Sequence, residues 1–107
     1  MDDETIKEIF NLYFKGKNFM TPDIIEYGCS DTYLYEFASG TGIERGTKMY
    51  GVTVIEILPG FSDAMEEYEK DATEENRDKL KKLIARDSDK SKCFHSMGEA
   101  LSHVRSL

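Results

Sequence analysis

"TYLYEFASGTGIERGTKMYGVTVIEI", residues 32–57, places two strand-like segments on either side of a glycine-rich connection. In the first segment, Tyr33, Tyr35 and Phe37 recur with the period of two that puts side chains on one face of a strand. The second segment, residues 48–57, is rich in β-branched residues and has apolar side chains on both faces, which is typical of an inner strand. The stretch therefore predicts two neighbouring strands of a small sheet.

The glycine-rich connection, residues 39–48, has the composition of a phosphate-binding loop but not its order. Such a loop needs backbone amides at the N-terminus of a helix, and the Walker form places its lysine directly after the last glycine. Here one residue separates Gly46 from Lys48, and a strand follows. We therefore predict a hairpin turn in which glycines supply positive φ angles. The alternative is a small-molecule or phosphate site at the hairpin tip, contacted by Arg45 and Lys48.

Helical patterns flank the hairpin towards both ends of the chain. Residues 2–15 carry apolar side chains at the i, i+3, i+4 and i+7 positions of one helical face, and Gly16 is expected to end this helix. Residues 96–107 predict another helix, because Ser96 and Glu99 have the spacing of a capping box. The expected core faces consist of Ile6, Ile9, Phe10 and Tyr13 in the first helix, and Met97, Ala100, Leu101 and Val104 in the last.

Residues 21–28, TPDIIEYG, allow two interpretations. Thr21 suits an N-cap and Pro22 suits the first helical position, which favours a short helix of about two turns. The β-branched pair Ile24 and Ile25 keeps a strand open as the alternative. We expect the helix.

The segment from 61 to 86 is helical in pattern and strongly charged. Residues 63–78 contain eight acids against two bases, whereas residues 79–92 contain six bases against two acids. Acids early and bases late complement a helix dipole, and opposite charges four positions apart stabilise a helix. One interpretation is therefore a solvated helix that stabilises itself. The pairs expected to do so are Glu66–Lys70, Glu75–Lys79 and Asp78–Lys82.

The alternative interpretation gives these acids a partner. Carboxylates gathered on one face can dock on a basic protein surface, because complementary charges steer association. They can also imitate the phosphates of a nucleic acid and so inhibit an enzyme that binds DNA or RNA. The candidate partner-binding residues are Glu66, Glu67, Glu69, Glu74 and Glu75.

Shorter features complete the expected organisation. Ser62 and Thr73 are candidate helix N-caps, and Leu80, Leu83 and Ile84 form a narrow apolar stripe. Residues 92–94, KCF, are expected to form a short third strand. The chain therefore predicts a single α+β domain over residues 1–107. An antiparallel hairpin or three-stranded sheet would be packed by N- and C-terminal helices, with a charged helical segment around 62–86.

The overall charge and hydropathy exclude several classes of protein. The formal net charge is −7 at pH 7, so the chain is repelled by nucleic acid backbones and anionic lipid, and direct binding to nucleic acid is not expected. No stretch approaches the ~20 apolar residues of a membrane span. The acidic start of the chain lacks the features of a signal peptide. With only two cysteines, we expect a cytoplasmic protein with reduced thiols.

Metal and catalytic chemistry find little support in the residue spacing. Cys93, His95 and His103 lie close together in sequence, and Cys29 could join them in space to hold zinc. However, the Cys-x2-Cys or His-x3-His pairs that mark such sites are absent, so a buried Cys93 beside a surface histidine is expected instead. No signature of an activated thiol or of a carboxylate pair with a raised pKa is present. We predict no enzyme, no cofactor and no metal.

Six tyrosines and six phenylalanines occur without a tryptophan. Tyrosine suits half-buried and interface positions, so Tyr33, Tyr35 and Tyr50 could present a sheet face to a partner. The preferred alternative is that a terminal helix covers this face. The functional hypothesis is a small acidic protein that binds a macromolecular partner, above all another protein, with a homodimer left open. Its size and style are those of accessory proteins of phages and mobile elements, although no motif carries that impression.

Overall fold

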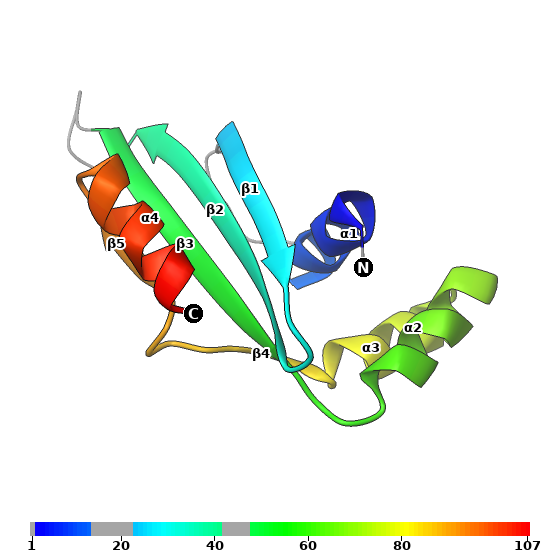
Figure 1. The fold of residues 1–107 in the computed structure, drawn as a ribbon. Helices are drawn as coiled ribbons and strands as arrows, with labels where there is room; N and C mark the ends of the chain where they lie inside the picture. Colours follow the sequence, from blue (N-terminus) through cyan, green and yellow to red (C-terminus); the bar gives the residue numbers. More distant parts are fainter. Residues whose placement is uncertain (1, 14–22, 42–47) are drawn as a thin grey trace.

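The computed structural model describes residues 2–13, 23–41 and 48–107 (Figure 1). These residues form an α+β fold in which helices near both ends of the chain pack an antiparallel five-stranded sheet, as the sequence predicts for the class. In chain order the elements are α1 (Asp3–Tyr13), β1 (Asp23–Cys29), β2 (Tyr33–Thr41), β3 (Lys48–Ile57), α2 (Phe61–Lys70), α3 (Glu74–Lys81), β4 (Ile84–Arg86), β5 (Lys92–Phe94) and α4 (Met97–Ser106).

The sheet is built around β3. β2 runs antiparallel along one edge of β3, up to the pair Thr41 and Lys48, so the two strands form the expected hairpin. β1 pairs with the other edge of β2. The second edge of β3 is shared, because β4 pairs with Ile55–Ile57 and β5 pairs with Tyr50–Val52. The sheet therefore has two strands more than the three expected at most.

A single serine closes the gap between β4 and β5. Residues 87–91 connect β4 to β5 and do not continue the strand pairing with β3. They lie opposite Val54, in the middle of β3. The Ser91 hydroxyl accepts a hydrogen bond from the Val54 N–H at 2.9 Å and donates one to the Val54 carbonyl at 3.3 Å. The Asp87 N–H also donates to this carbonyl, at 2.9 Å. The peptide groups of a buried central strand are thus satisfied where no strand lies beside them.

The two faces of the sheet carry separate cores. Figure 1 shows α4 on one face and α1, α2 and α3 on the other side of the sheet. Alternation along β2 sends Leu34 to the α1 side and Phe37 to the α4 side, as the period of two requires. The buried residues of the α1 side are Ile6, Ile9, Phe10, Leu12, Leu34, Ile55, Phe61, Met65, Leu80 and Ile84. Those of the α4 side are Phe37, Val52, Val54, Ala100 and Val104.

The expected helix over residues 21–28 is wrong. Asp23–Cys29 forms strand β1, paired with β2 from Asp23 opposite Ser39 to Cys29 opposite Leu34. The register shifts between Ile24 and Glu26, which marks a β-bulge. The turn after β1 is short enough for a hairpin, so pairing with β2 overrides a helical propensity that the two β-branched isoleucines already weaken. Thr21 and Pro22, on which the expectation rested, lie outside the described residues.

The charged helical segment is divided and ends earlier than expected. α2 and α3 are separate helices, and residues 84–86 form strand β4. Ile84 is buried, so the apolar stripe of the sequence is continued by a strand residue, while Leu83 is only half-buried. Thr73 caps α3 as predicted, since its hydroxyl accepts from the Asn76 N–H at 3.2 Å. Ser62 does not cap α2, because Gly60, with φ of 93°, turns the chain into the helix before it.

The terminal helices confirm most of the expected core faces. In α1, Ile6, Ile9 and Phe10 are buried, whereas the side chain of Tyr13 and residues 14–16 lie outside the described part. In α4, Ser96 caps the helix with its hydroxyl 3.5 Å from the Glu99 N–H. The buried residues of α4 are Ala100 and Val104, with Leu101 half-buried.

Met97 was expected in the core face of α4, and the structure contradicts this. Its side chain is 42% exposed. Met97 is the first residue of α4, so it stands one turn before the part of the helix that reaches the sheet through Ala100.

No helix among the described residues combines the length and apolar character of a membrane span.

Candidate functional site

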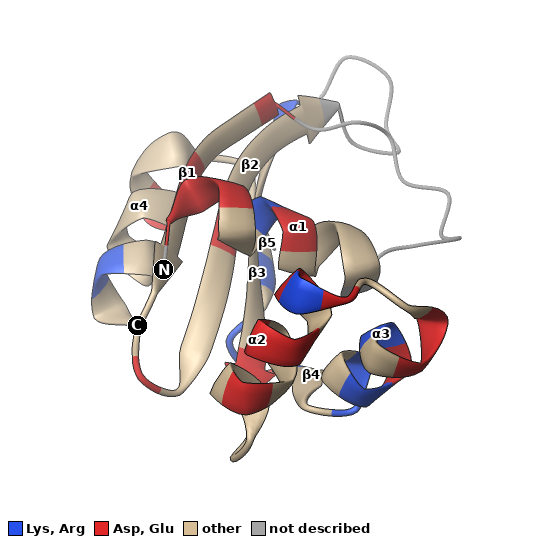
Figure 2. Cartoon of the chain, turned by 90° about the vertical axis from the view of Figure 1, so that its right-hand side faces the viewer, with Lys and Arg blue, Asp and Glu red and all other residues tan. Residues whose placement is uncertain are grey.

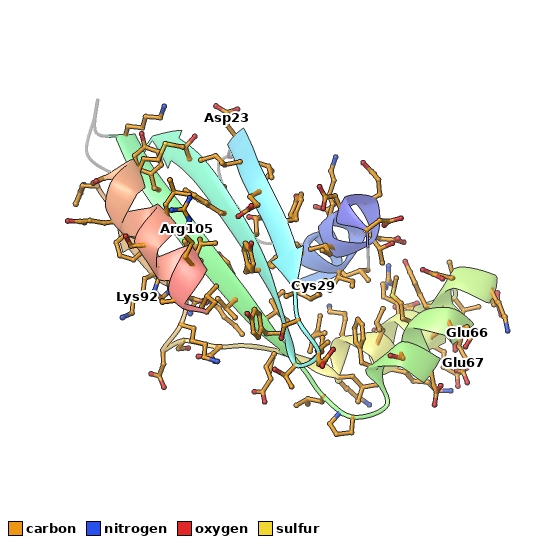
Figure 3. All side chains as sticks on the ribbon, in the orientation of Figure 1. Asp23, Cys29, Glu66, Glu67, Lys92 and Arg105 are labelled. Carbon is orange, nitrogen blue, oxygen red and sulfur yellow. The ribbon has the colours of Figure 1, made fainter. Side chains whose placement is uncertain are left out.

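The acidic residues of interest lie on α2 and at the start of α3. Phe61 and Met65 bury one side of α2, which leaves the opposite side to carboxylates. Figure 2 shows acidic residues along α2, and Figure 3 shows Glu66 and Glu67 on its outer side, away from the sheet. We call α2 and α3 with their five predicted carboxylates the acidic helix pair. All five are exposed: Glu66, Glu67, Glu69, Glu74 and Glu75.

The ion pairs of the acidic helix pair are local and weak. Glu66 lies 3.6 Å from Lys70 and Glu75 lies 3.8 Å from Lys79, which confirms two of the three predicted pairs. The Asp78–Lys82 pair is not among the ion pairs of the described residues, and Lys82 lies beyond the last residue of α3. Such exposed pairs each contribute only a few tenths of a kcal/mol. The acids therefore remain available to a partner at small energetic cost.

The three predicted tyrosines all lie on the α4 side of the sheet. Tyr33, Tyr35 and Tyr50 are half-buried and pack against the core that α4 completes. α4 itself lies along β3 and β5 (Figure 1). Two lysines lie near the rings: Lys90 Nζ is 5.6 Å from the Tyr33 centroid and Lys48 Nζ is 5.7 Å from the Tyr50 centroid. The face is thus partly covered by a terminal helix, the alternative preferred from the sequence.

Tyr35 reaches across to the edge strand of the sheet. Its ring occupies the space above Gly28 of β1, where a Cβ would collide with the ring atoms. Its hydroxyl donates a hydrogen bond to Glu26 Oε2 at 3.0 Å. Burial, and then the hydrogen bond and negative charge of Glu26, raise the pKa of Tyr35 to about 12. β1 thus contributes a carboxylate and β2 an aromatic ring to one small polar feature.

Acidic groups also gather on the α1 side of β1. Tyr27 is half-buried there against the α1 core. Its pKa is raised by burial first, and then by the negative charges of Glu36, Glu4 and Asp3. Burial alone raises the pKa of Glu36 on β2. Both faces of β1 therefore lie in a field of carboxylates.

The glycine-rich connection gives no described site. Lys48 is exposed at the first position of β3, and Arg45 lies outside the described residues. The neighbouring strands form a hairpin rather than a strand-to-helix turn, so no described helix N-terminus follows the connection. The phosphate-site hypothesis gains no contact from the described residues.

The cysteines and histidines do not converge. Cys29 ends β1 and Cys93 lies on β5, at opposite edges of the sheet (Figure 1). Cys93 is exposed, so the expectation that it is buried is wrong: it lies on the short strand β5 and is paired with Gly51, which has no side chain to cover it. His103 is engaged with Lys90, its Nε2 lying 2.5 Å from the carbonyl oxygen. Within the described residues no cluster of three or more His, Cys, Asp or Glu is placed to hold a metal.

Comparison of the chain with protein-family models, with curated proteins and with solved structures gives no match. The assignment of a function therefore depends on the surfaces described above. Sequence reasoning identified the acidic helix pair and the three tyrosines. It missed the contribution of β1, because β1 was expected to be a helix.

Proposed function

We propose that this chain is a small non-enzymatic protein that acts by binding a macromolecular partner, namely a protein with a basic surface. The observation that carries the proposal is the acidic helix pair. Its five carboxylates are exposed, while the same helices bury Phe61, Met65 and Leu80 against the rest of the fold. The acids are therefore presented by elements anchored in the core.

The expected mechanism is electrostatic steering followed by docking. A surface of one charge raises the encounter rate with a surface of opposite charge, and the effect falls as salt screens it. Weak local pairs such as Glu66–Lys70 leave the carboxylates able to exchange a lysine of the chain for one of the partner. The proposal includes a cytoplasmic location, no direct contact with nucleic acid, and an accessory role of the kind that phages and mobile elements encode.

The test is a variant in which the five glutamates of the acidic helix pair are changed to glutamine. A matched control neutralises five exposed acids elsewhere, so that both variants have the same net charge. Parent, variant and control are immobilised and exposed to extract from the native host at low and at high salt. The control carries Asp2→Asn, Glu8→Gln, Glu56→Gln, Asp89→Asn and Glu99→Gln.

We expect the parent and the control to capture the same protein at low salt, and the five-site variant to capture less of it. The loss should be mainly in the association rate, because rim charges steer encounter more than they hold a complex. Equal affinity of parent and variant at both salts would contradict the proposal. If the captured protein is a DNA- or RNA-binding enzyme and duplex nucleic acid competes for it, the chain is a nucleic-acid mimic. Capture of the chain itself would indicate a homodimer.

A further inference from the structure

The side of β1 that faces away from β2, over residues 23–28, is the end of the sheet, and we call it the β1 edge. Among the described strands, β1 pairs only with β2. The opposite end of the sheet is divided between two strands of three residues each, β4 and β5, and short interrupted strands are a usual protection against further pairing. β1 is a single strand of seven residues, with one β-bulge between Ile24 and Glu26. The β1 edge is therefore the longer template for an added strand.

Exposed apolar side chains mark this strand. Ile24 and Ile25 are each 40% exposed, and they and Met97 are the exposed large hydrophobic residues of the described chain. Their neighbours Asp23 and Glu26 are also exposed. Two adjacent exposed isoleucines on an edge strand are unfavourable in water, and burial of their remaining surface would favour association.

The charge around the β1 edge has one sign. Residues 23–41, which span β1, the turn and β2, contain four acids and no base: Asp23, Glu26, Asp31 and Glu36. Asp3 and Glu4 of α1 add to this field, since their charges act on Tyr27 of β1. An antiparallel pair of two β1 strands centred on Glu26 would bring two carboxylates opposite each other, which is destabilising. The charge therefore favours a basic strand over a second copy of this chain.

A lysine or arginine on such a strand would find a receptor already formed. Glu26 and the ring of Tyr35 lie together on the α4 side of β1, joined by the 3.0 Å hydrogen bond. A cation beside Glu26 would gain a charge-assisted contact and a cation–π contact with the half-buried ring. The same face already accepts one lysine of the chain, since Lys90 lies 5.6 Å above the neighbouring Tyr33 ring.

We propose that the β1 edge binds an extended, lysine- or arginine-bearing segment of a partner protein as an added strand of the sheet. Main-chain hydrogen bonds to β1 would supply affinity, and contacts with Glu26, Tyr35 and the exposed isoleucines would supply preference for basic and aliphatic side chains. The inference rests on the proposed function in that the ligand is a basic protein segment. It places that segment on a surface separate from the acidic helix pair.

The probe for this proposal is a capped peptide of alternating lysine and valine residues, about as long as β1. It is titrated into the isotope-labelled full chain, and backbone amides are followed by two-dimensional NMR and by hydrogen exchange. We expect shifts along β1 and, at saturation, about tenfold slower exchange of β1 amides that gain a ladder bond. A peptide with glutamate in place of lysine should leave β1 unchanged.

Matched variants separate the edge from general attraction to an acidic protein. Ile25→Lys places on the β1 edge a positive charge, the same sign as that of the peptide. It should weaken peptide binding about tenfold or more, because a strand edge that carries lysine resists pairing. Met97→Lys makes the same change on α4, at a side chain with similar exposure, and should have no effect. Glu26→Gln should weaken binding, whereas Glu56→Gln, at another exposed sheet carboxylate, should not.

Two results would overturn the proposal: peptide-induced shifts confined to α2 and α3, or equal binding by the lysine and glutamate peptides. The test also stands apart from that of the proposed function. The five-site glutamine variant of the acidic helix pair should still bind the peptide at β1. One outcome is that the peptide does not bind at β1, while the five-site glutamine variant still loses its natural partner. The proposed function then stands and the β1 edge is excluded as the binding surface.

Discussion

Tyr35 lies over Gly28, so that an aromatic ring of β2 takes the place of the side chain missing from the edge strand β1. The two residues are opposite each other in the antiparallel register. A glycine in a strand exposes backbone and packs nothing, and a cross-strand aromatic ring compensates for both. The hydroxyl of the same ring binds Glu26. Gly28 therefore permits the contact of Tyr35 of β2 with the edge strand β1, on the α4 side of the sheet.

Gly28→Ala is expected to displace the Tyr35 ring. The Cβ would collide with the outer atoms of this ring, which can rotate away, so the fold should persist. The gain in strand propensity and the loss of ring contacts oppose each other, and the net change in unfolding free energy should stay within about 1 kcal/mol. The clearer measurement is a spectrophotometric titration, in which the pKa of Tyr35 should fall towards its ordinary value of 10.0. Gly51→Ala is the control, since a Cβ added there would lie 4.0 Å from Cys93 Sγ, an ordinary van der Waals distance.

Stability at alkaline pH should depend on Tyr35. Its pKa is about 12 in the folded chain against 10.0 for the ordinary side chain. Between these values the unfolded chain loses a proton that the folded chain keeps, so this contribution to stability is complete below pH 10 and is lost as the pH rises towards 12. Tyr35→Phe removes the titrating group, and the fall in unfolding free energy over this window should be shallower in the variant. The unfolding free energy of both proteins is measured by urea unfolding at several pH values. An equally steep fall with pH in the parent and in Tyr35→Phe would contradict this prediction.

The hairpin and the terminal helices were predictable because their signals are local. Tyr33, Tyr35 and Phe37 recur along β2 with a period of two. β3 is rich in β-branched residues and has apolar side chains on both faces, so both strands can be recognised from sequence alone. Thr73 and Ser96 cap the helices that follow them, as short polar side chains before a helical pattern usually do. In these segments local propensity and tertiary packing favour the same structure, which is the usual condition for a correct prediction.

Where prediction failed, pairing with another strand decided the structure. Asp23–Cys29 follows a helix-start signal at Thr21 and Pro22, but it forms a strand because it pairs with β2 along its length. Residues 84–86 continue a helical stripe in sequence, yet they pair with the end of β3. The same errors limited the candidate site, since Glu26 and Ile25 gain their interest only as members of an edge strand. The acids of α2 needed no tertiary information, because their exposure follows from their charge.

The two cores offer a comparison of leucines with different burial. Leu34 is fully buried on the α1 side, whereas Leu101 of α4 is half-buried. Leu34→Ala should reduce the unfolding free energy by about 2–5 kcal/mol, the range for a buried leucine. Leu101→Ala should cost about half as much, because less apolar surface leaves water there on folding. Urea unfolding of both variants provides the measurement. A change under roughly 0.5 kcal/mol for Leu101→Ala would show that α4 is not docked on the sheet.

Ser91 is expected to be the most sensitive polar residue of the sheet. Its hydroxyl pairs with both peptide groups of Val54 in the gap between β4 and β5, and the residue is only 9% exposed. Ser91→Ala leaves the buried Val54 N–H without its hydrogen-bond acceptor, at a cost of about 1–3 kcal/mol. Ser88→Ala, at an exposed position of the same loop, should change stability by less than about 0.5 kcal/mol. Amide exchange at Val54 should accelerate in the Ser91 variant alone. Equal stability and unchanged exchange at Val54 would mean that water or the Asp87 loop replaces the serine, and that β4 and β5 do not depend on it to stay beside β3.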